Sequence, residues 1–347
     1  MKKVYFMAFI ATAALTVMSC SNDDITTGGD LSKNEATAIN FSTYLGRNVE
    51  TRAGETTSEN IKTSGFGVFA SYTTSGWSTA ATSNFMFNQS VTNSEGNWTY
   101  SPVKYWTSEG KFSFFAYAPY ATDDNGIATS SNNTTAGAPV LKIMVPTDHS
   151  KMIDFVAANA MNKTYSSSES GEVKFTLKHE MTRAAFKATK ATTVDSKTTV
   201  TVKNITLKSK KLYTTATYTF ASDASSKGSW TPTELTSDNS ISLSNLSLTG
   251  DVTSPYLYLI PVAELGENDV TAEITYEVKT EDDKLAGGSV TTTGKKEVKL
   301  PASSLQQGKS YLFTLTVSLD EIKLTATVDA NWDADSSESN TISVGGN

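Results

Sequence analysis

The stretch 311–328, YLFTLTVSLDEIKLTATV, decides the fold class, because apolar and polar residues alternate along nearly all of it. The apolar positions of its first half are Tyr311, Phe313, Leu315, Val317 and Leu319, and those of its second half are Ile322, Leu324, Ala326 and Val328. A strict period of two predicts strands with one buried face. The phase changes at Asp320-Glu321, which predicts a turn or bulge between two strands.

The same alternation recurs towards the N-terminus. It runs through 270–278 and 212–220, and near Asn204 its phase flips, which predicts another bulge. Helical signals are few: 301–307 begins with proline and is followed by Gly308, and 154–161 is a second short candidate. Many short strands with few helices predict an all-β fold of two antiparallel β-sandwich domains in line, with short helices only.

The N-terminal segment differs in composition from the strand-rich remainder of the chain. Lys2 and Lys3 precede an apolar run at 4–17, which predicts a secretory signal peptide over 1–19. Cys20, the only cysteine, follows directly and reads as a lipidated first residue, in preference to an ordinary signal peptide with an incidental cysteine. Residues 20–52 are then a linker that includes the first strand, and a Ser-rich break at 166–171 separates domains at 53–170 and 171–347.

Charge and linker composition limit the partners. The formal net charge is −7, and loss of the two signal-peptide lysines makes it more negative. An acidic chain repels phosphates, so nucleic acid is not an expected partner. The acidic start of the linker, Ser21-Asn22-Asp23-Asp24, is either a signal for display on the outer face of an outer membrane or simply solvated spacer.

The search for catalytic chemistry finds little. The two histidines are His149 and His179, and Arg183 stands where a zinc-binding helix motif starting at His179 needs its second histidine. No Gly-x-Ser-x-Gly elbow is present. We therefore expect no enzyme, no metal and no cofactor, with His179 packed or at the surface.

Two further patterns resemble binding sites but are explained better without a ligand. Acidic and amide residues alternate near the C-terminus as in a calcium loop, but Ala334 and Asn340 replace the required glycine and glutamate, so a solvated tail is favoured. The alternating residues are Asp329, Asn331, Asp333 and Asp335. Clustered aromatic residues are either a sugar-stacking platform or, as we favour, core packing. They are Trp98, Tyr100, Tyr105, Trp106, Phe114, Phe115 and Tyr117.

Several short motifs, in order along the chain, resemble those of the fimbrillin-like proteins, a family of pilus subunits made as lipidated precursors. The motifs are INF at 39–41, TRA at 51–53, GFGVF at 65–69, FMFNQ at 85–89, WTYSP at 98–102, KYW at 104–106, FSFFAYAPY at 112–120, FTLKH at 175–179, YLIP at 258–261, GKSY at 308–311 and VDANW at 328–332. The resemblance covers most of the mature chain. It implies a structural subunit of a cell-surface fimbria that supports adhesion.

The resemblance also implies a route of assembly. A protease cuts after an arginine near the first strand and removes lipid and strand together, and a neighbouring subunit then donates a C-terminal strand to the open groove. Here the removable strand is marked by Ile39, Phe41 and Leu45. The donor candidates are Ile322, Leu324, Ala326 and Val328, or the shorter segment 341–344. The implied partners are other fimbrial subunits, an arginine-specific protease and the outer membrane through Cys20.

The processing site is predicted between Arg52 and Ala53, with Arg47 as the alternative. Residues 54–58, GETTS, read as flexible and polar, where a protease has access. The same tripeptide at Thr182-Arg183-Ala184 lies in a strand-like run and should be protected. A second function stays open: a permanently tethered surface lipoprotein that binds glycan through its aromatic residues.

Overall fold

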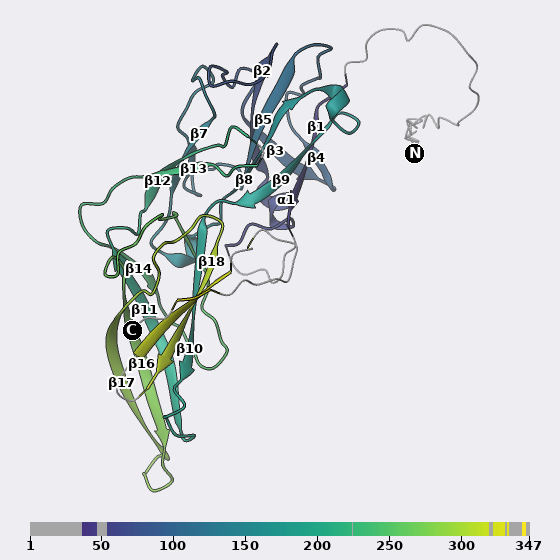
Figure 1. Cartoon of the computed structure of the whole chain (residues 1–347). Coiled ribbons are helices and arrows are strands. Elements are labelled where there is room, and N and C mark those ends of the chain that lie inside the picture. The colour runs from purple at the N-terminus through teal and green to yellow at the C-terminus, as the bar shows by residue number, and fades with distance from the viewer. Residues whose placement is uncertain are drawn as a thin grey trace, which may run out of the picture. The chain divides into compact units, whose positions relative to one another are not determined.

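The computed structural model describes residues 37–46, 54–223, 225–318 and 322–329, together with Trp332 and residues 342–344. All of them belong to one compact unit, residues 36–347. The predicted all-β fold is confirmed, since nearly all regular structure in these residues is strand (Figure 1). Within the described ranges, no helix is long and apolar enough to cross a membrane.

A seven-stranded sheet contains most of the N-terminal strands. In spatial order it runs β1 (Asn40–Leu45), β9 (Glu172–His179), β8 (Val156–Lys163), β5 (Lys111–Ala118), β2 (Phe66–Thr73), β3 (Met86–Ser94) and β4 (Asn97–Thr99). The short helix α1 (Asn60–Ser64) and the 3-10 turns η1 (His149–Lys151) and η2 (Tyr165–Ser167) lie in its connections.

Three smaller sheets complete the fold. The first contains β15 (Leu257–Leu259), β10 (Thr182–Lys190), β18 (Ser310–Val317), β19 (Ile322–Asp329) and β20 (Ile342–Val344). The second contains β14 (Asn239–Leu243), β11 (Thr198–Ser209), β16 (Thr271–Glu281) and β17 (Ser289–Lys299). The third contains β13 (Ser229–Pro232), β12 (Thr215–Thr219), β7 (Val140–Met144) and β6 (Ile127–Thr129).

The middle of the seven-stranded sheet is covered on both faces. In β5, Phe112 and Phe114 point into one core cluster, which they share with β1, β8 and β9, whereas Phe115 and Tyr117 point into the other. The second cluster continues through β6, β7 and β12 into the C-terminal sheets. Burial on both sides explains why β2 and β5 are apolar almost throughout instead of alternating.

Strand pairing crosses the predicted boundary at residue 170. β9, which follows that boundary, joins β1 and β8, and β12 pairs with β7 over Thr215–Thr219. The division into domains at 53–170 and 171–347 stays a prediction. The sheets place β9 with the N-terminal strands, because its Val173, Phe175 and Leu177 fill the same core cluster as β1.

Three details of the predicted fold need correction. Residues 154–161 are not helical, because β8 pairs with β5 from Val156 onwards. Residues 301–307 form no helix either, since Leu305 is 1% exposed and bridges Val262 through two backbone hydrogen bonds of 2.8 Å. The sheets are also not purely antiparallel, because β1 pairs with β9, and β10 with β18, in parallel.

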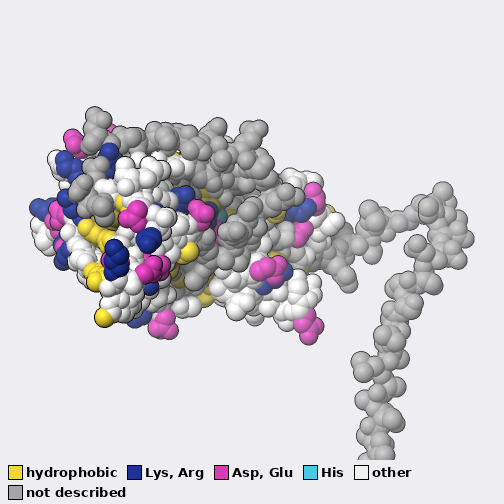
Figure 2. All heavy atoms as spheres, turned by 90° about the horizontal axis from the view of Figure 1, so that it is seen from below, with side chains coloured by type: hydrophobic (Ala, Val, Ile, Leu, Met, Phe, Trp, Pro, Cys, Tyr) yellow, Lys and Arg dark blue, Asp and Glu magenta, His cyan; other side chains and the backbone are white. Residues whose placement is uncertain are grey.

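The bulge predicted near Asn204 is confirmed, since the register of β11 against β16 shifts between Val202 and Asn204. On the face shown in Figure 2, basic and acidic side chains of the described residues are interspersed, and hydrophobic side chains appear only in scattered places. Among the described residues seen there, charges of one sign form no extended patch.

Candidate assembly site

The first strand lies at the edge of the seven-stranded sheet and is held by a single ladder. Its six residues pair in parallel with residues 172–177 of β9. Away from this ladder, the printed contacts hold its two ends: Ala38 bridges Tyr105, the Ile39 N–H donates to the Lys104 carbonyl at 2.9 Å, and the Ser58 hydroxyl donates to the Leu45 carbonyl at 3.0 Å. An edge strand with one ladder is the element of a sheet that is most easily exchanged.

The side chains of β1 nevertheless fill the core. Ile39, Phe41 and Leu45 are 0%, 4% and 2% exposed, which matches the alternation seen in the sequence. The Phe41 ring lies 5.3 Å from that of Tyr100 and 5.7 Å from that of Phe175, measured between centroids. Whether this strand is removable stays a prediction.

Two polar contacts lie at the N-terminal end of the paired strands β1 and β9. The Tyr100 hydroxyl donates to the Ile39 carbonyl at 2.8 Å, and the Trp106 ring N–H donates to the Gly171 carbonyl at 2.9 Å. Burial raises the pKa of Tyr100 above its ordinary value, so the hydroxyl stays a donor. Tyr100 therefore ties the start of β1 to the segment that precedes β5.

The residues after the predicted cut are not a flexible spacer, which corrects the expectation for 54–58. Glu55, Thr56 and Thr57 are 7%, 5% and 2% exposed. The Thr56 hydroxyl donates to the Asp154 carbonyl at 2.6 Å, and the Gly54 carbonyl accepts from the Asp154 N–H at 2.9 Å. The polar composition misled the prediction, because these groups are buried with partners instead of being hydrated.

Glu55 belongs to a buried polar cluster that sequence reasoning missed. It pairs with Arg183 of β10, with the Arg183 Nη1 2.5 Å from its Oε1. Trp332 lies 8% exposed beside both, and its ring N–H donates to the same Oε1 at 3.1 Å. The Arg183 guanidinium lies 4.6 Å from the Trp332 ring centroid, so charge and aromatic face also attract each other.

The cluster continues to His179, whose ring stacks on that of Trp332. Its ring lies 3.9 Å from that of Trp332, at an interplanar angle of 11°. Its Nδ1 is 2.6 Å from an Asp154 carboxylate oxygen, and both side chains are buried. His179 is thus a packed histidine, as predicted, and within the described ranges no group of three or more His, Cys, Asp or Glu could hold a metal ion.

The second Thr-Arg-Ala lies in β10, so its strand-like run is confirmed, and its protection from a protease stays a prediction. The sequence signal for the cluster was weak, because its members come from segments far apart in the chain. Only the quoted motifs FTLKH and VDANW contain His179 and Trp332, and nothing in either motif indicates that the two rings stack.

The aromatic residues mostly pack inside. Trp106, Phe114, Phe115 and Tyr117 are buried, Trp98 and Tyr100 are partly buried, and Tyr105 is 49% exposed. Core packing, the favoured interpretation, therefore holds for all of them except Tyr105.

The donor candidates lie in the sheet of β10. Ile322, Leu324 and Ala326 of β19 are buried, Val328 is half-buried, and β19 pairs with β18 on one edge and β20 on the other. β20, which corresponds to the 341–344 candidate, pairs with β19 at three positions.

Several predicted site residues lie outside the described residues. They are Cys20, Arg47, Arg52 and Ala53, and the same holds for Asn331, Asp333 and Asp335 of the rejected calcium loop.

Comparison with known proteins identifies the class. A family model described as fimbrillin-like matches residues 51–332. The fimbrium subunit Fim1C of Phocaeicola vulgatus is 29% identical, over 94% of this chain and 96% of its own. The chain belongs to the fimbrillin-like family, and the resemblance drawn from its motifs is confirmed.

Solved structures support the fold. A fimbrial protein from Bacteroides vulgatus superposes with a TM-score of 0.70 at 24% identity, covering 89% of this chain and 99% of its own. A structure from Bacteroides uniformis superposes with a TM-score of 0.52 at 16% identity, covering 85% and 98%. At these identities the likeness concerns the fold alone.

Proposed function

We propose that this protein is a structural subunit of a cell-surface fimbria that supports adhesion and has no catalytic role. It is exported as a lipoprotein anchored at Cys20, cut after Arg52 and polymerised by strand exchange. Its partners are other fimbrial subunits, as its membership of the fimbrillin-like family suggests. The observation that carries the proposal is β1, an edge strand held by one ladder whose apolar side chains are buried in the core.

The position of the cut fits this role. Arg47 and Arg52 both lie between β1, which ends at Leu45, and the buried anchor that starts at Glu55. A cut there separates the strand from the body while Thr56 stays hydrogen-bonded to Asp154. Loss of Ile39, Phe41 and Leu45 uncovers apolar surface worth about 5 kcal/mol by area, which a strand from a neighbour can cover again.

The test of processing is Arg52→Ala on cells, with Arg47→Ala as the matched variant. We expect Arg52→Ala to remain an uncut, membrane-bound monomer, whereas Arg47→Ala is processed and forms pili. Pili formed by uncut Arg52→Ala as well as by wild type would refute strand exchange. Cys20→Ala tests the anchor: it should incorporate no labelled fatty acid.

For the donor, the pairing favours β20 over β19. Release of β20 breaks one short ladder, whereas release of β19 also removes Ile322, Leu324 and Ala326 from the core. Deletion of residues 342–347 should therefore leave the fold intact and stop chain growth. Deletion from residue 320 should unfold the C-terminal sheet, and normal chain growth after the shorter deletion would exclude β20 as the donor.

The alternative of a tethered glycan-binding lipoprotein lacks a specific observation in its favour, since most of the aromatic residues on which it depended are buried.

A further inference from the structure

The site that Phe41 of β1 fills is lined by aromatic rings. Four rings surround that of Phe41, with centroids between 5.3 Å (Tyr100) and 6.3 Å (Phe66) away. Phe175 stacks on it at an interplanar angle of 24°, whereas Phe66 and Phe114 meet it edge-on at 83° and 78°. Aromatic pairs in these arrangements attract each other beyond the area that they bury. The surroundings of Phe41 therefore match a ring both in shape and in charge distribution.

The walls of this ring pocket are themselves held by further rings. Trp98 lies edge-on to Phe66 with centroids 4.9 Å apart, and Trp106 lies 6.2 Å from Phe114 at an interplanar angle of 72°. Phe66 and Phe114 are both 0% exposed. Because the walls have neighbours behind them, they close poorly around a smaller side chain in place of Phe41, and the cost grows with the volume left unfilled.

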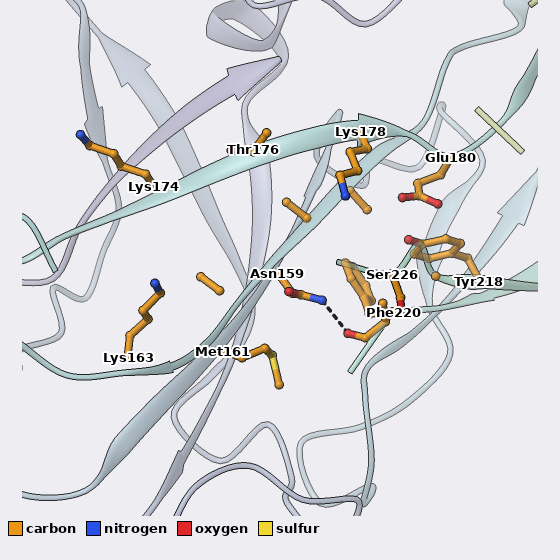
Figure 3. A pocket seen from close by; sticks show the side chains of 15 residues that line it. Asn159, Met161, Lys163, Lys174, Thr176, Lys178, Glu180, Tyr218, Phe220 and Ser226 are labelled. Carbon is orange, nitrogen blue, oxygen red and sulfur yellow. Dashed lines mark hydrogen bonds between the residues drawn. The ribbon is translucent and has the colours of Figure 1, made fainter. Parts of the chain in front are cut away.

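The opposite face of β9 discriminates little between strands. Figure 3 shows the side chains of that face lining a separate cavity of about 440 Å³; they are Lys174, Thr176 and Lys178. In the parallel register Ser42 lies beside Lys174, and Tyr44 beside Thr176. Lys174 and Thr176 are exposed, so alternate residues of any strand in the place of β1 meet polar groups and solvent there.

The choice between strands therefore depends on the ring pocket. Main-chain hydrogen bonds hold an added strand whatever its sequence, and the pockets for alternate side chains give specificity. The Tyr100 hydroxyl, for example, donates to the carbonyl of Ile39, a group that every residue provides. The buried positions of Ile39 and Leu45 take aliphatic side chains, which most strands carry, whereas that of Phe41 takes a ring.

The candidate donor strands of this chain carry no ring. The two segments read IKLTATV at 322–328 and TISVGGN at 341–347. When Ile322 or Ile342 is set at the position of Ile39, Leu324 or Val344 falls at that of Phe41. The single aromatic residue after Phe313 is Trp332, which is 8% exposed in the buried polar cluster.

We propose that the groove left by β1 selects a donor strand with an aromatic side chain at the position of Phe41. The strand that fits has an aliphatic residue two positions before the ring and another four positions after it, as in β1. A second copy of this chain offers no such strand, so the donor belongs to a different subunit, and β20 of this chain serves a groove of another kind. This selectivity rests on the proposed strand exchange and adds the chemistry of the partner to it.

The test uses the full chain carrying Cys20→Ala and Arg47→Ala, cut after Arg52 with an arginine-specific protease. Labelled, end-blocked peptides compete with the cut strand for the groove, and fluorescence anisotropy gives the Kd of each. Relative to the peptide of residues 37–46, its Phe41→Leu form should bind at least about tenfold more weakly, because ring contacts are lost and space is left. The matched control, Tyr44→Leu, removes a ring that is 51% exposed and should change the Kd by less than about threefold.

A gain of binding tests the same pocket with the chain's own sequence. The peptide of residues 320–329 should bind at least about tenfold more weakly than that of 37–46, and its Leu324→Phe form should recover at least about fivefold. Equal binding of the unsubstituted 320–329 or 340–347 peptide and the 37–46 peptide would overturn the proposal in favour of a second copy as the donor. Equal binding of the Phe41→Leu form and its parent would overturn it as well.

A second measurement requires no exchange of strands. In the uncut chain, residues 39–45 are replaced by IKLTATV or by IKFTATV, which differ only at position 41. The version with the ring should unfold at the higher urea concentration, and equal midpoints would overturn the selectivity. If the ring stabilises the uncut chain but no peptide displaces the cut strand, the preference of the pocket stands and the proposed strand exchange fails.

Discussion

Among single residues, Tyr100 controls how firmly the first strand is held. Its hydroxyl donates to the Ile39 carbonyl and accepts from the Lys104 N–H at 3.2 Å. Its ring lies against Phe41. One side chain thus fixes both the backbone and the largest side chain of β1 to the body of the sheet.

We predict that Tyr100→Phe loosens β1 without changing the fold. The ring is kept and both hydrogen bonds of the hydroxyl are lost, of which the one to the Ile39 carbonyl holds the strand and is worth about 1 kcal/mol. After arginine-specific cleavage, release of the β1 peptide should rise about fivefold, measured by size-exclusion chromatography and mass spectrometry. An unchanged release would show that this hydrogen bond does not hold the strand.

The contribution of the Tyr100 hydroxyl to holding β1 should fall at high pH. Because burial raises the pKa of Tyr100 in the folded protein, its contribution is fully present below about pH 10, the ordinary pKa, and is lost as the pH rises through the folded value. The difference in β1 release between wild type and Tyr100→Phe should therefore shrink in strongly alkaline buffer. A constant difference would contradict the burial of the hydroxyl.

At the scale of the element, β1 combines weak backbone attachment with strong side-chain burial. A single ladder to β9 means that little backbone pairing opposes exchange. Three buried side chains mean that the vacant groove is unstable until a strand refills it. The element is therefore suited to replacement and not to simple loss.

We predict that Phe41→Ala in the uncut chain lowers the free energy of unfolding of the N-terminal strands by about 3–5 kcal/mol. The ring packs against four aromatic neighbours that cannot all close the space. These are Tyr100, Phe175, Phe114 and Phe66. The matched control is Asn40→Ala, an exposed position of the same strand, which should change stability by less than about 0.5 kcal/mol. Urea denaturation measures both, and equal effects would show that β1 is not packed as described.

Across the whole molecule, the buried polar cluster links the beginning and the end of the folded chain. Glu55 follows β1, and Trp332 follows β19. Both contact Arg183 of β10, and Trp332 also stacks on His179, the last residue of β9. The segment that follows β1 and the segment between β19 and β20 therefore share one set of contacts.

We predict that Trp332→Ala destabilises the chain by about 3–5 kcal/mol. The loss uncovers His179 and removes the hydrogen bond to Glu55, whose other carboxylate oxygen is already buried with no partner among the described residues. Trp332→Phe should cost less, because it keeps the stack and loses only the N–H donor. Tyr105→Ala, an exposed aromatic, serves as the control in thermal unfolding. A small effect of Trp332→Ala would mean that the cluster does not join the two ends.

The sequence by itself determined what depends on local pattern. The alternation at 311–328 predicts paired strands, and β18 and β19 pair there from Ser310 to Asp329. The change of phase near Asn204 predicts a bulge, because one extra residue in a strand moves the apolar positions to the other face. The register shift of β11 against β16 lies there. The alternation of Ile39, Phe41 and Leu45 likewise predicts the buried face of β1.

Only the tertiary structure decided what depends on which segments meet. Within 154–161, residues from Val156 onwards pair with β5 as a strand, and in the polar run 55–57 Glu55 pairs with Arg183 and Thr56 bonds Asp154. The parallel pairing of β9 with β1 has no local signal, since the two strands lie far apart in the chain. Periodicity reports the faces of a strand, whereas partners and charge compensation come from residues far away in the chain, so they appear only once the chain has folded.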